Sequence, residues 1–244
     1  MTELLQQYWR QYLWGSPGHW SGLAVTLWLT VAAVVLGFGL ALPLAIMRAS
    51  SGPCLGAPVW LFTYLFRGTP LYVQLLICYT GLYSLEAVRS TPVLNVFFKD
   101  ALNCTLLAFA LNTAAYTTEI FAGAIKATPV GEVEAARAFG MSGFVLYRRI
   151  VLPSALRRAL PAYSNEVILM LHATTLASTA TITDLLKVAR NAASDYYLPF
   201  VAYGLAALLY LAVTMGLVWA FHRAERKWLA YLRPVRSDAR GTKN

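Results

Sequence analysis

The sequence predicts an all-α integral membrane protein with five transmembrane helices and a polar helical hairpin between the third and the fourth. The first observation is composition: 58% of the 244 residues are hydrophobic and 13% are charged, against about 25% charged in soluble domains. The second is a series of five apolar blocks, each long enough to cross about 30 Å of hydrocarbon. The third is the gathering of basic residues in every second connection.

The first 20 residues are predicted to form an N-terminal interfacial segment. Apolar and aromatic side chains recur there at helical spacing, which is typical of an amphipathic helix lying at a membrane interface. They are Leu4, Leu5, Tyr8, Trp9, Tyr12 and Leu13. The alternative is a terminal extension that packs on the helical bundle. Because no apolar run precedes a small-residue cleavage site, we do not expect a cleavable signal peptide here.

Residues 21–222 hold the predicted transmembrane domain, which begins with the uncharged span Ser21–Met47. The second hydrophobic block, Val59–Leu85, is interrupted at Arg67-Gly68-Thr69-Pro70, because proline removes a backbone donor and disfavours helix at the residue before it. Transporters tend to bind substrate at such breaks. We therefore expect Thr69 and Gln74 to line a pathway. Arg67 is equally compatible with a position at the cytoplasmic interface.

The third span, Ala101–Ala124, follows a predicted polar loop over Glu86–Asp100. It carries three embedded polar residues, Asn103, Asn112 and Glu119. Such residues usually face the interior of a bundle. Because Glu119 lies close to the cytoplasmic end, an ion pair with a loop arginine is at least as good an interpretation as a transport role.

The hairpin, residues 125–159, is the longest charge-rich segment between apolar blocks. Thr128 is a good N-cap, and Pro129 suits the first helical position. Gly140 is placed to end this first helix. Ser142 can start a second short helix, which we expect Pro153 to stop.

The fourth span, Leu160–Ile182, contains Asn165, Glu166 and His172. A short helix is expected in the loop that follows, Thr183–Leu198, with Leu185, Leu186 and Val188 on the outer surface of the bundle. Phe200–Phe221 is the fifth span, and residues 223–244 form a basic tail.

Basic residues fix the predicted orientation. The side of the hairpin holds Arg48, six basic residues in the hairpin and seven in the tail, whereas the other side holds only Arg10, Arg89, Lys99, Lys187 and Arg190. The hairpin and the C-terminus should therefore be cytoplasmic, and the N-terminus periplasmic. The net charge of +9 then serves membrane orientation and lipid contact rather than nucleic-acid binding.

Several chemistries have no signature in the sequence. It has no phosphate-binding loop for ATP and no spacing typical of a hydrolase or a zinc protease. Cys54, Cys78 and Cys104 form no metal-binding or disulfide pattern. We therefore expect no catalytic residues, no metal and no cofactor in this chain.

Four segments of the sequence carry a resemblance to a known family. Glu134-Ala135-Ala136, Gly140 after three further residues, and then Ile150-x-Leu152-Pro153 resemble the loop named after Glu-Ala-Ala in bacterial ABC importer permeases. The stretches Phe66–Leu75, Ala115–Phe121 and Leu160–Glu166 are similar to the permeases for polar amino acids within that family.

The resemblance implies the fold of a type I ABC importer permease in a bacterial inner membrane. It also implies that the seven residues of the loop motif dock a coupling helix onto a cytoplasmic ATPase. The implied partners are a second homologous permease subunit, two copies of the ATPase, which bind the ATP, and a periplasmic amino-acid-binding protein.

Glu166 points to the class of substrate. A carboxylate inside a span costs on the order of 2.5–3.5 kcal/mol unless a cation or a wet cavity offsets it. The side-chain cation of lysine, arginine, ornithine or protonated histidine is one such partner, with Asn165 beside it. The alternative for Glu166 is a structural pair with an arginine such as Arg67. For the whole chain, the alternatives are a noncatalytic membrane scaffold and an ion-coupled secondary transporter.

Overall fold

The computed structural model describes residues 2–16, 19–49 and 52–229, and within these ranges the chain is almost entirely helical. The first half contains α1 (Thr2–Leu13), the two-residue antiparallel strands β1 (Gly15–Ser16) and β2 (His19–Trp20), α2 (Gly22–Ala49), α3 (Pro53–Gly68), α4 (Leu71–Leu76), the π-helical turn η1 (Ile77–Gly81), α5 (Leu82–Ser84), α6 (Glu86–Ser90), α7 (Pro92–Lys99) and α8 (Ala101–Lys126). The second half contains α9 (Val130–Ala138), α10 (Gly143–Leu146), the π-helical turn η2 (Tyr147–Val151), α11 (Leu152–Ala173), the 3₁₀ helix η3 (Thr174–Ala180), α12 (Leu185–Tyr196) and α13 (Pro199–Trp228).

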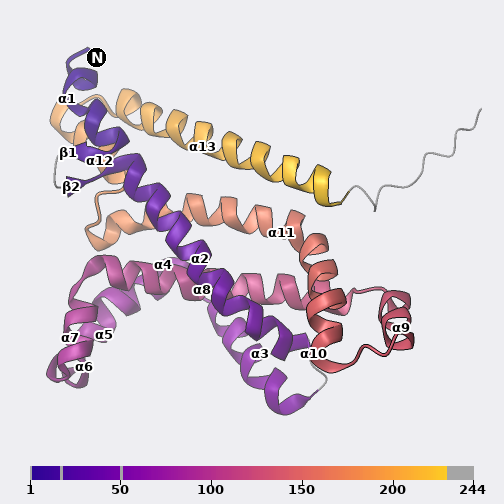
Figure 1. Cartoon of the computed structure of the whole chain (residues 1–244). Helices are drawn as coiled ribbons and strands as arrows, with labels where there is room; N and C mark the ends of the chain where they lie inside the picture. The colour runs from indigo at the N-terminus through magenta and orange to yellow at the C-terminus, as the bar shows by residue number, and fades with distance from the viewer. Residues whose placement is uncertain (1, 17–18, 50–51, 230–244) are drawn as a thin grey trace, which may run out of the picture.

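Helices α2 and α8 cross at the centre of the molecule, with α11 packed on both and α13 lying beyond α11 (Figure 1). Small residues allow the close approach of α2 and α8: a side chain added at Gly37 would lie 2.0 Å from Cγ2 of Thr113. The central core combines Leu29 of α2, Phe109 of α8 and Met170 of α11. This crossing places the polar residues of α8 between α2, α4 and α11.

The two ends of the bundle differ (Figure 1). The hairpin formed by α9 and α10 lies at one end, together with the C-terminal end of α13. Helices α1, α6, α7 and α12 lie at the opposite end. The hairpin and the end of α13 therefore share a side, as the predicted orientation requires.

Only α2 and α13 are long and apolar enough, among the described helices, to cross a membrane singly. Two bent pairs pass the same test together: Cys54–Gly68 with Leu71–Ser84, at 102°, and Pro92–Lys99 with Ala101–Lys126, at 87°. The described residues thus supply two to four spans by length and composition. Helix α11, which carries two arginines and Glu166, is not among the helices that meet this test, and the count of five remains a prediction.

The second hydrophobic block breaks where the sequence predicts, but the two halves turn by about a right angle instead of forming one interrupted rod. Thr69 is extended, with φ −113° and ψ 143°, and Pro70 precedes α4. The prediction of a polar loop over Glu86–Asp100 is wrong, because α6 and α7 occupy most of it. Thr91 and Asp100, both extended, separate these short helices from their neighbours.

The placement of Leu185 and Val188 on the outer surface is also wrong, since both side chains are fully buried. They pack against Leu4 and Tyr8 of α1, and Ala202 of α13 lies in the same cluster. The hydroxyl of Tyr8 donates a hydrogen bond to Asp195 of α12. The N-terminal segment therefore packs on the bundle, as the alternative interpretation has it, while Trp9 stays exposed.

The fifth predicted span continues as helix beyond Phe221, since α13 ends at Trp228. The rest of the predicted basic tail, residues 230–244, lies outside the described residues.

Candidate functional site

The turn of the hairpin has the geometry that the sequence predicts for Gly140. Its φ is +78°, a conformation that glycine adopts without the clash that a Cβ creates. The amide of Gly140 donates to the carbonyl of Arg137, and the amide of Met141 donates to the carbonyl of Ala136 at 3.1 Å. This pair of bonds is a Schellman motif, which satisfies the last carbonyls of α9 and turns the chain sharply.

The two ends of the hairpin differ from the prediction. Helix α9 starts one residue late, because Pro129 has an extended ψ of 130° and acts as the N-cap, while Thr128 accepts a hydrogen bond from Arg158 instead. Pro153 does not stop the second helix: it is an early residue of α11, which continues to Ala173. The π-helical turn η2 precedes it, and a proline near a helix start costs little since its missing amide hydrogen has no required partner there.

A groove of about 450 Å³ lies between α9 and the start of α11. It is lined by Ala135, Ala136, Ile150 and Pro153, which are four of the residues singled out in the sequence. The other lining residues are Glu132, Phe139, Met141, Arg149, Ser154 and Arg157. Small alanine side chains on one wall and charged residues at the edge make this a surface that another protein can approach closely.

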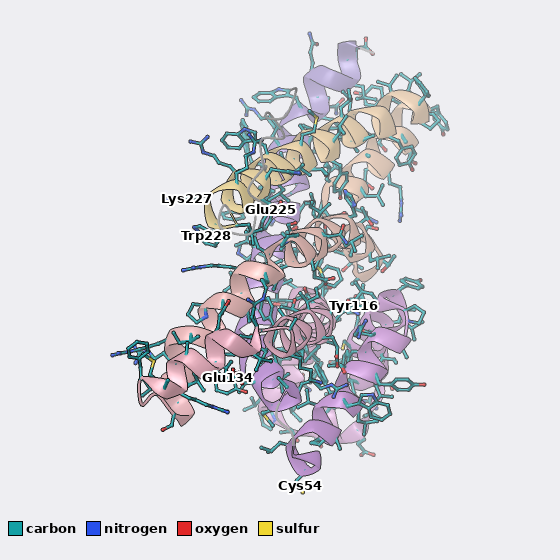
Figure 2. All side chains as sticks on the ribbon, turned by 90° about the vertical axis from the view of Figure 1, so that its right-hand side faces the viewer. Cys54, Tyr116, Glu134, Glu225, Lys227 and Trp228 are labelled. Carbon is teal, nitrogen blue, oxygen red and sulfur yellow. The ribbon has the colours of Figure 1, made fainter. Side chains whose placement is uncertain are left out.

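The remaining motif residues lie beside this groove. Glu134 is exposed on α9, and Figure 2 shows it well separated from Glu225 and Lys227 at the end of α13. Leu152 is partly buried and packs on the core cluster under the hairpin. Gly140 forms the turn itself. The structure thus brings all seven residues to one end of the molecule.

Two exposed aromatic residues on the hairpin were missed by the sequence analysis. Phe139 is 85% exposed and Phe144 is 76% exposed. They flank Gly140, in a hairpin otherwise rich in small and charged residues. The two phenylalanines beside a predicted turn could have indicated a protein-binding surface, because aromatic side chains are enriched where proteins bind one another.

The break before α4 is held together by Gln74. Its amide nitrogen lies 2.8 Å from Oγ1 of Thr69, 3.0 Å from the carbonyl of Thr69 and 2.7 Å from that of Phe66. Its oxygen accepts a hydrogen bond from Asn112 of α8 at 3.1 Å. Gln74 is buried and Thr69 is exposed, so these two predicted pathway residues are in contact but face different surroundings.

Glu166 lies on the other side of α8. Its carboxylate accepts a hydrogen bond from Thr113 at 3.1 Å, and the residue is only 6% exposed. Asn165, by contrast, is exposed. Consecutive residues of α8, Asn112 and Thr113, therefore join it to Gln74 of α4 and to Glu166 of α11.

Arg48 and Arg67 contact residues other than Glu166. The guanidinium of Arg48 donates to Glu119 at 2.9 Å, and Thr63 donates to the same oxygen at 2.7 Å, which confirms the predicted ion pair of Glu119. Arg67 of α3 stacks on the ring of Tyr116 of α8, with its guanidinium carbon 5.2 Å from the ring centroid. Within the described residues, Arg67 and Glu166 form no salt bridge.

Comparison with known proteins gives the same architecture. Residues 33–227 match the family model described as "Binding-protein-dependent transport system inner membrane component". The chain is 59% identical over 232 residues to the histidine/lysine/arginine/ornithine transport system permease protein HisM of Salmonella typhimurium, covering 95% of this chain and 99% of that protein. It is 45% identical over 191 residues to the octopine transport system permease protein OccM of Rhizobium radiobacter, covering 78% of each.

Solved structures of ABC transporters are also similar. A chain of an amino acid ABC transporter crystallised with histidines matches with a TM-score of 0.73 and 32% identity, over 84% of this chain and 92% of that one. A chain of the MetNI methionine ABC transporter has the same fold, with a TM-score of 0.70 and 17% identity, over 93% of this chain and 97% of that one. The chain belongs to the family of inner-membrane components of binding-protein-dependent transport systems.

Proposed function

We propose that this chain is a permease subunit of an ATP-driven importer of basic amino acids. One observation carries the proposal: 59% identity along 95% of the chain to a permease named for histidine, lysine, arginine and ornithine transport. A scaffold or an ion-coupled transporter is not favoured, because the match covers nearly the full length of both proteins.

The hairpin is the proposed docking surface for a cytoplasmic ATPase, which would bind and hydrolyse the ATP. The proposed contacts are Glu134, Ala135, Ala136, Gly140, Ile150, Leu152 and Pro153. The groove lined by several of these residues and the exposed rings of Phe139 and Phe144 support this assignment. Aromatic side chains that fill pockets in a partner contribute much of the binding free energy at protein interfaces.

The proposed substrate pathway includes Thr69, Gln74, Asn165 and Glu166, and runs beside α8. Glu166 would supply the negative charge that a cationic side chain needs at membrane depth. Its carboxylate is buried against Thr113 in this conformation. A substrate cation would therefore reach Glu166 only when α8 and α11 separate, which is the kind of change that alternating access requires.

A second permease subunit is proposed to complete the pathway, with a periplasmic binding protein delivering the amino acid. Helix α13 supports the idea of further contacts with subunits or lipid, because it is apolar and mostly exposed, with Trp219 and Phe200 among its uncovered side chains. In the proposed orientation the N-terminus is periplasmic, and the hairpin and the C-terminus are cytoplasmic.

The test is purification of the tagged chain with its partners from the native membrane, followed by ATPase assays with a panel of amino acids. We expect an ATPase with a phosphate-binding loop and a second permease in the preparation. Hydrolysis should rise with arginine, lysine, ornithine or histidine in the presence of the binding protein, and not with acidic or apolar amino acids. Stimulation by ions alone, or no associated ATPase, would contradict the proposal.

A further inference from the structure

Arg158 of α11 forms a network at the base of the hairpin. Its side chain is 16% exposed. Nη1 donates to Oγ of Ser154 at 2.7 Å, and Nη2 donates to Oγ1 of Thr128 at 2.8 Å and, at 3.5 Å, to the carbonyl of Ala124. Nη1 also lies 3.8 Å from Glu132, whose other carboxylate oxygen accepts a hydrogen bond from Ser154 at 2.6 Å.

These five residues come from three helices and the segment that joins two of them. Ala124 belongs to α8, and Thr128 lies two residues beyond the end of that helix. Glu132 belongs to α9, and Ser154 and Arg158 belong to α11. Arginine suits such a junction, because its planar guanidinium directs several donors in fixed directions. Hydrogen bonds that involve a charged group are about twice as strong as neutral ones.

Helix α9 has only non-helical connections to the rest of the chain. On one side the link passes through Pro129, which is extended. On the other side it passes through Gly140 and Gly143, whose φ angles are +78° and +49°. Such connections transmit displacement poorly, because a few dihedral angles can absorb it. The network of Arg158 is thus a polar link from α9 to α11 and, through the Arg158 side chain, to the end of α8.

The network also reaches the groove and the interior. Glu132 and Ser154 line the groove between α9 and α11, so a protein docked there would press on the network. Helix α11 carries Glu166 two turns beyond Arg158, and α8 carries its partner Thr113. A displacement of α9 that reaches α8 and α11 therefore reaches the contact between these two residues.

We propose that Arg158 is a positioning residue that fastens α9 to the adjoining ends of α8 and α11, so that displacement of the hairpin is passed to both helices and through them to the Glu166–Thr113 contact. The proposal rests on the proposed importer function, since the displacement would come from the ATPase. Arg158 would set how many amino acids are transported per ATP hydrolysed, and it would take no part in ATP hydrolysis or in substrate binding.

The test uses the complete complex, reconstituted in liposomes with its binding protein. Arg158→Met keeps the aliphatic stem and removes the donors. We expect the number of amino acids transported per ATP hydrolysed to fall at least fivefold, with hydrolysis within twofold of wild type. Arg158→Lys keeps the charge without the fork and should give an intermediate ratio. Arg148→Met is the matched control, because Arg148 is exposed on the same hairpin and lies outside the network and the groove. The number of amino acids transported per ATP should be unchanged in this variant.

A second measurement reports the rigidity itself. Spin labels on Arg137 of α9 and Leu169 of α11, both exposed, should give a narrow distance distribution in the wild type and a broad one in Arg158→Met. Thr128→Val removes one acceptor with less disturbance and should broaden it partly. An unchanged ratio together with a narrow distribution in Arg158→Met would overturn the proposal. If the wild-type complex shows no ATP-driven uptake, the importer function fails instead, and the distance distributions still decide whether Arg158 fastens the hairpin.

Discussion

The hydroxyl of Thr113 on α8 donates a hydrogen bond to Oε1 of Glu166 on α11, at 3.1 Å, and both residues are buried. Gly37 of α2 packs against the other side of Thr113. The position of the Thr113 side chain therefore depends on the absence of a side chain on α2, and the environment of the buried acid depends on both.

Gly37→Ala should destabilise the protein. The added Cβ would lie 2.0 Å from Cγ2 of Thr113, so Thr113 must rotate or α2 must move away from α8. Overpacking of this kind costs about 1–3 kcal/mol. Thermal unfolding in detergent should show a lower Tm. Gly39→Ala, on the same helix with nothing within 4 Å of its added Cβ, should not lower it. Equal Tm values for the two variants would contradict the close approach of α2 and α8.

Gly140→Ala should weaken attachment of the ATPase while the chain still inserts. Nothing lies within 4 Å of the added Cβ, but the φ of +78° is strained for a side chain, at about 1–2 kcal/mol. That corresponds to about a fivefold to thirtyfold change in an equilibrium. The amount of ATPase retained on affinity purification measures the effect. Gly131→Ala, on the same helix without positive φ or a close neighbour, should retain the wild-type amount; equal retention by both variants would refute the prediction.

The pH dependence of stability should include Asp184, the N-cap of α12. Its carboxylate accepts hydrogen bonds from the amides of Leu186 and Lys187. Burial nevertheless raises its pKa from the ordinary 3.8 to about 6, against the opposing effect of these bonds and of Arg190. Because the pKa of Asp184 is higher in the folded than in the unfolded state, proton binding by this carboxyl stabilises the fold. This contribution is complete below about pH 3.8 and is lost as the pH rises through about 6.

Asp184→Asn isolates this contribution, because asparagine caps a helix about as well as aspartate. Between pH 4 and pH 7 the wild type should lose on the order of 1–3 kcal/mol relative to the variant. Thermal unfolding at several pH values measures the difference. A parallel pH dependence in the two proteins would show that Asp184 has the same pKa folded and unfolded.

Cysteine labelling should test the orientation. Cys54 is exposed, whereas Cys78 and Cys104 are buried, so Cys54→Ser gives a suitable background. Glu86→Cys and Asn191→Cys, at exposed positions, should react with an impermeant reagent added from the periplasm. Ser142→Cys, at the exposed tip of the hairpin, should react only after the membrane is opened. The reverse pattern would place the hairpin in the periplasm and remove it from any cytoplasmic ATPase.

Local features of the fold were predictable, and contacts between distant segments were not. The turn at Gly140 and the break before Pro70 follow from the backbone chemistry of glycine and proline, which a sequence shows directly. The effect of Pro153 was misjudged, since a π-helical turn just before it lets the chain continue as helix. The burial of Leu185 and Val188 depends on α1, which is more than 170 residues away in the sequence.

The candidate site shows the same limit. That Glu119 needs a cation follows from its place in an apolar segment, and Arg48 supplies it. No pattern in the sequence indicates that Thr113 binds Glu166, or that Gln74 is held by Asn112, because these pairs form only when the helices cross. The groove beside α9 could not be predicted from the sequence either, because it forms only when the folded hairpin places α9 against the start of α11.

The central claim is best tested by uptake of labelled arginine and lysine into liposomes that contain the complete complex, wild type or Glu166→Gln. Glutamine keeps the shape and the acceptor for Thr113 and removes the charge. We expect ATP-dependent uptake of both amino acids by the wild type, and at least a tenfold loss in the variant, about 1.4 kcal/mol of lost interaction, while the complex assembles and hydrolyses ATP. Unchanged uptake of every cationic amino acid by Glu166→Gln would contradict the role of this carboxylate, and absence of ATP-dependent uptake by the wild type would contradict the proposed function itself.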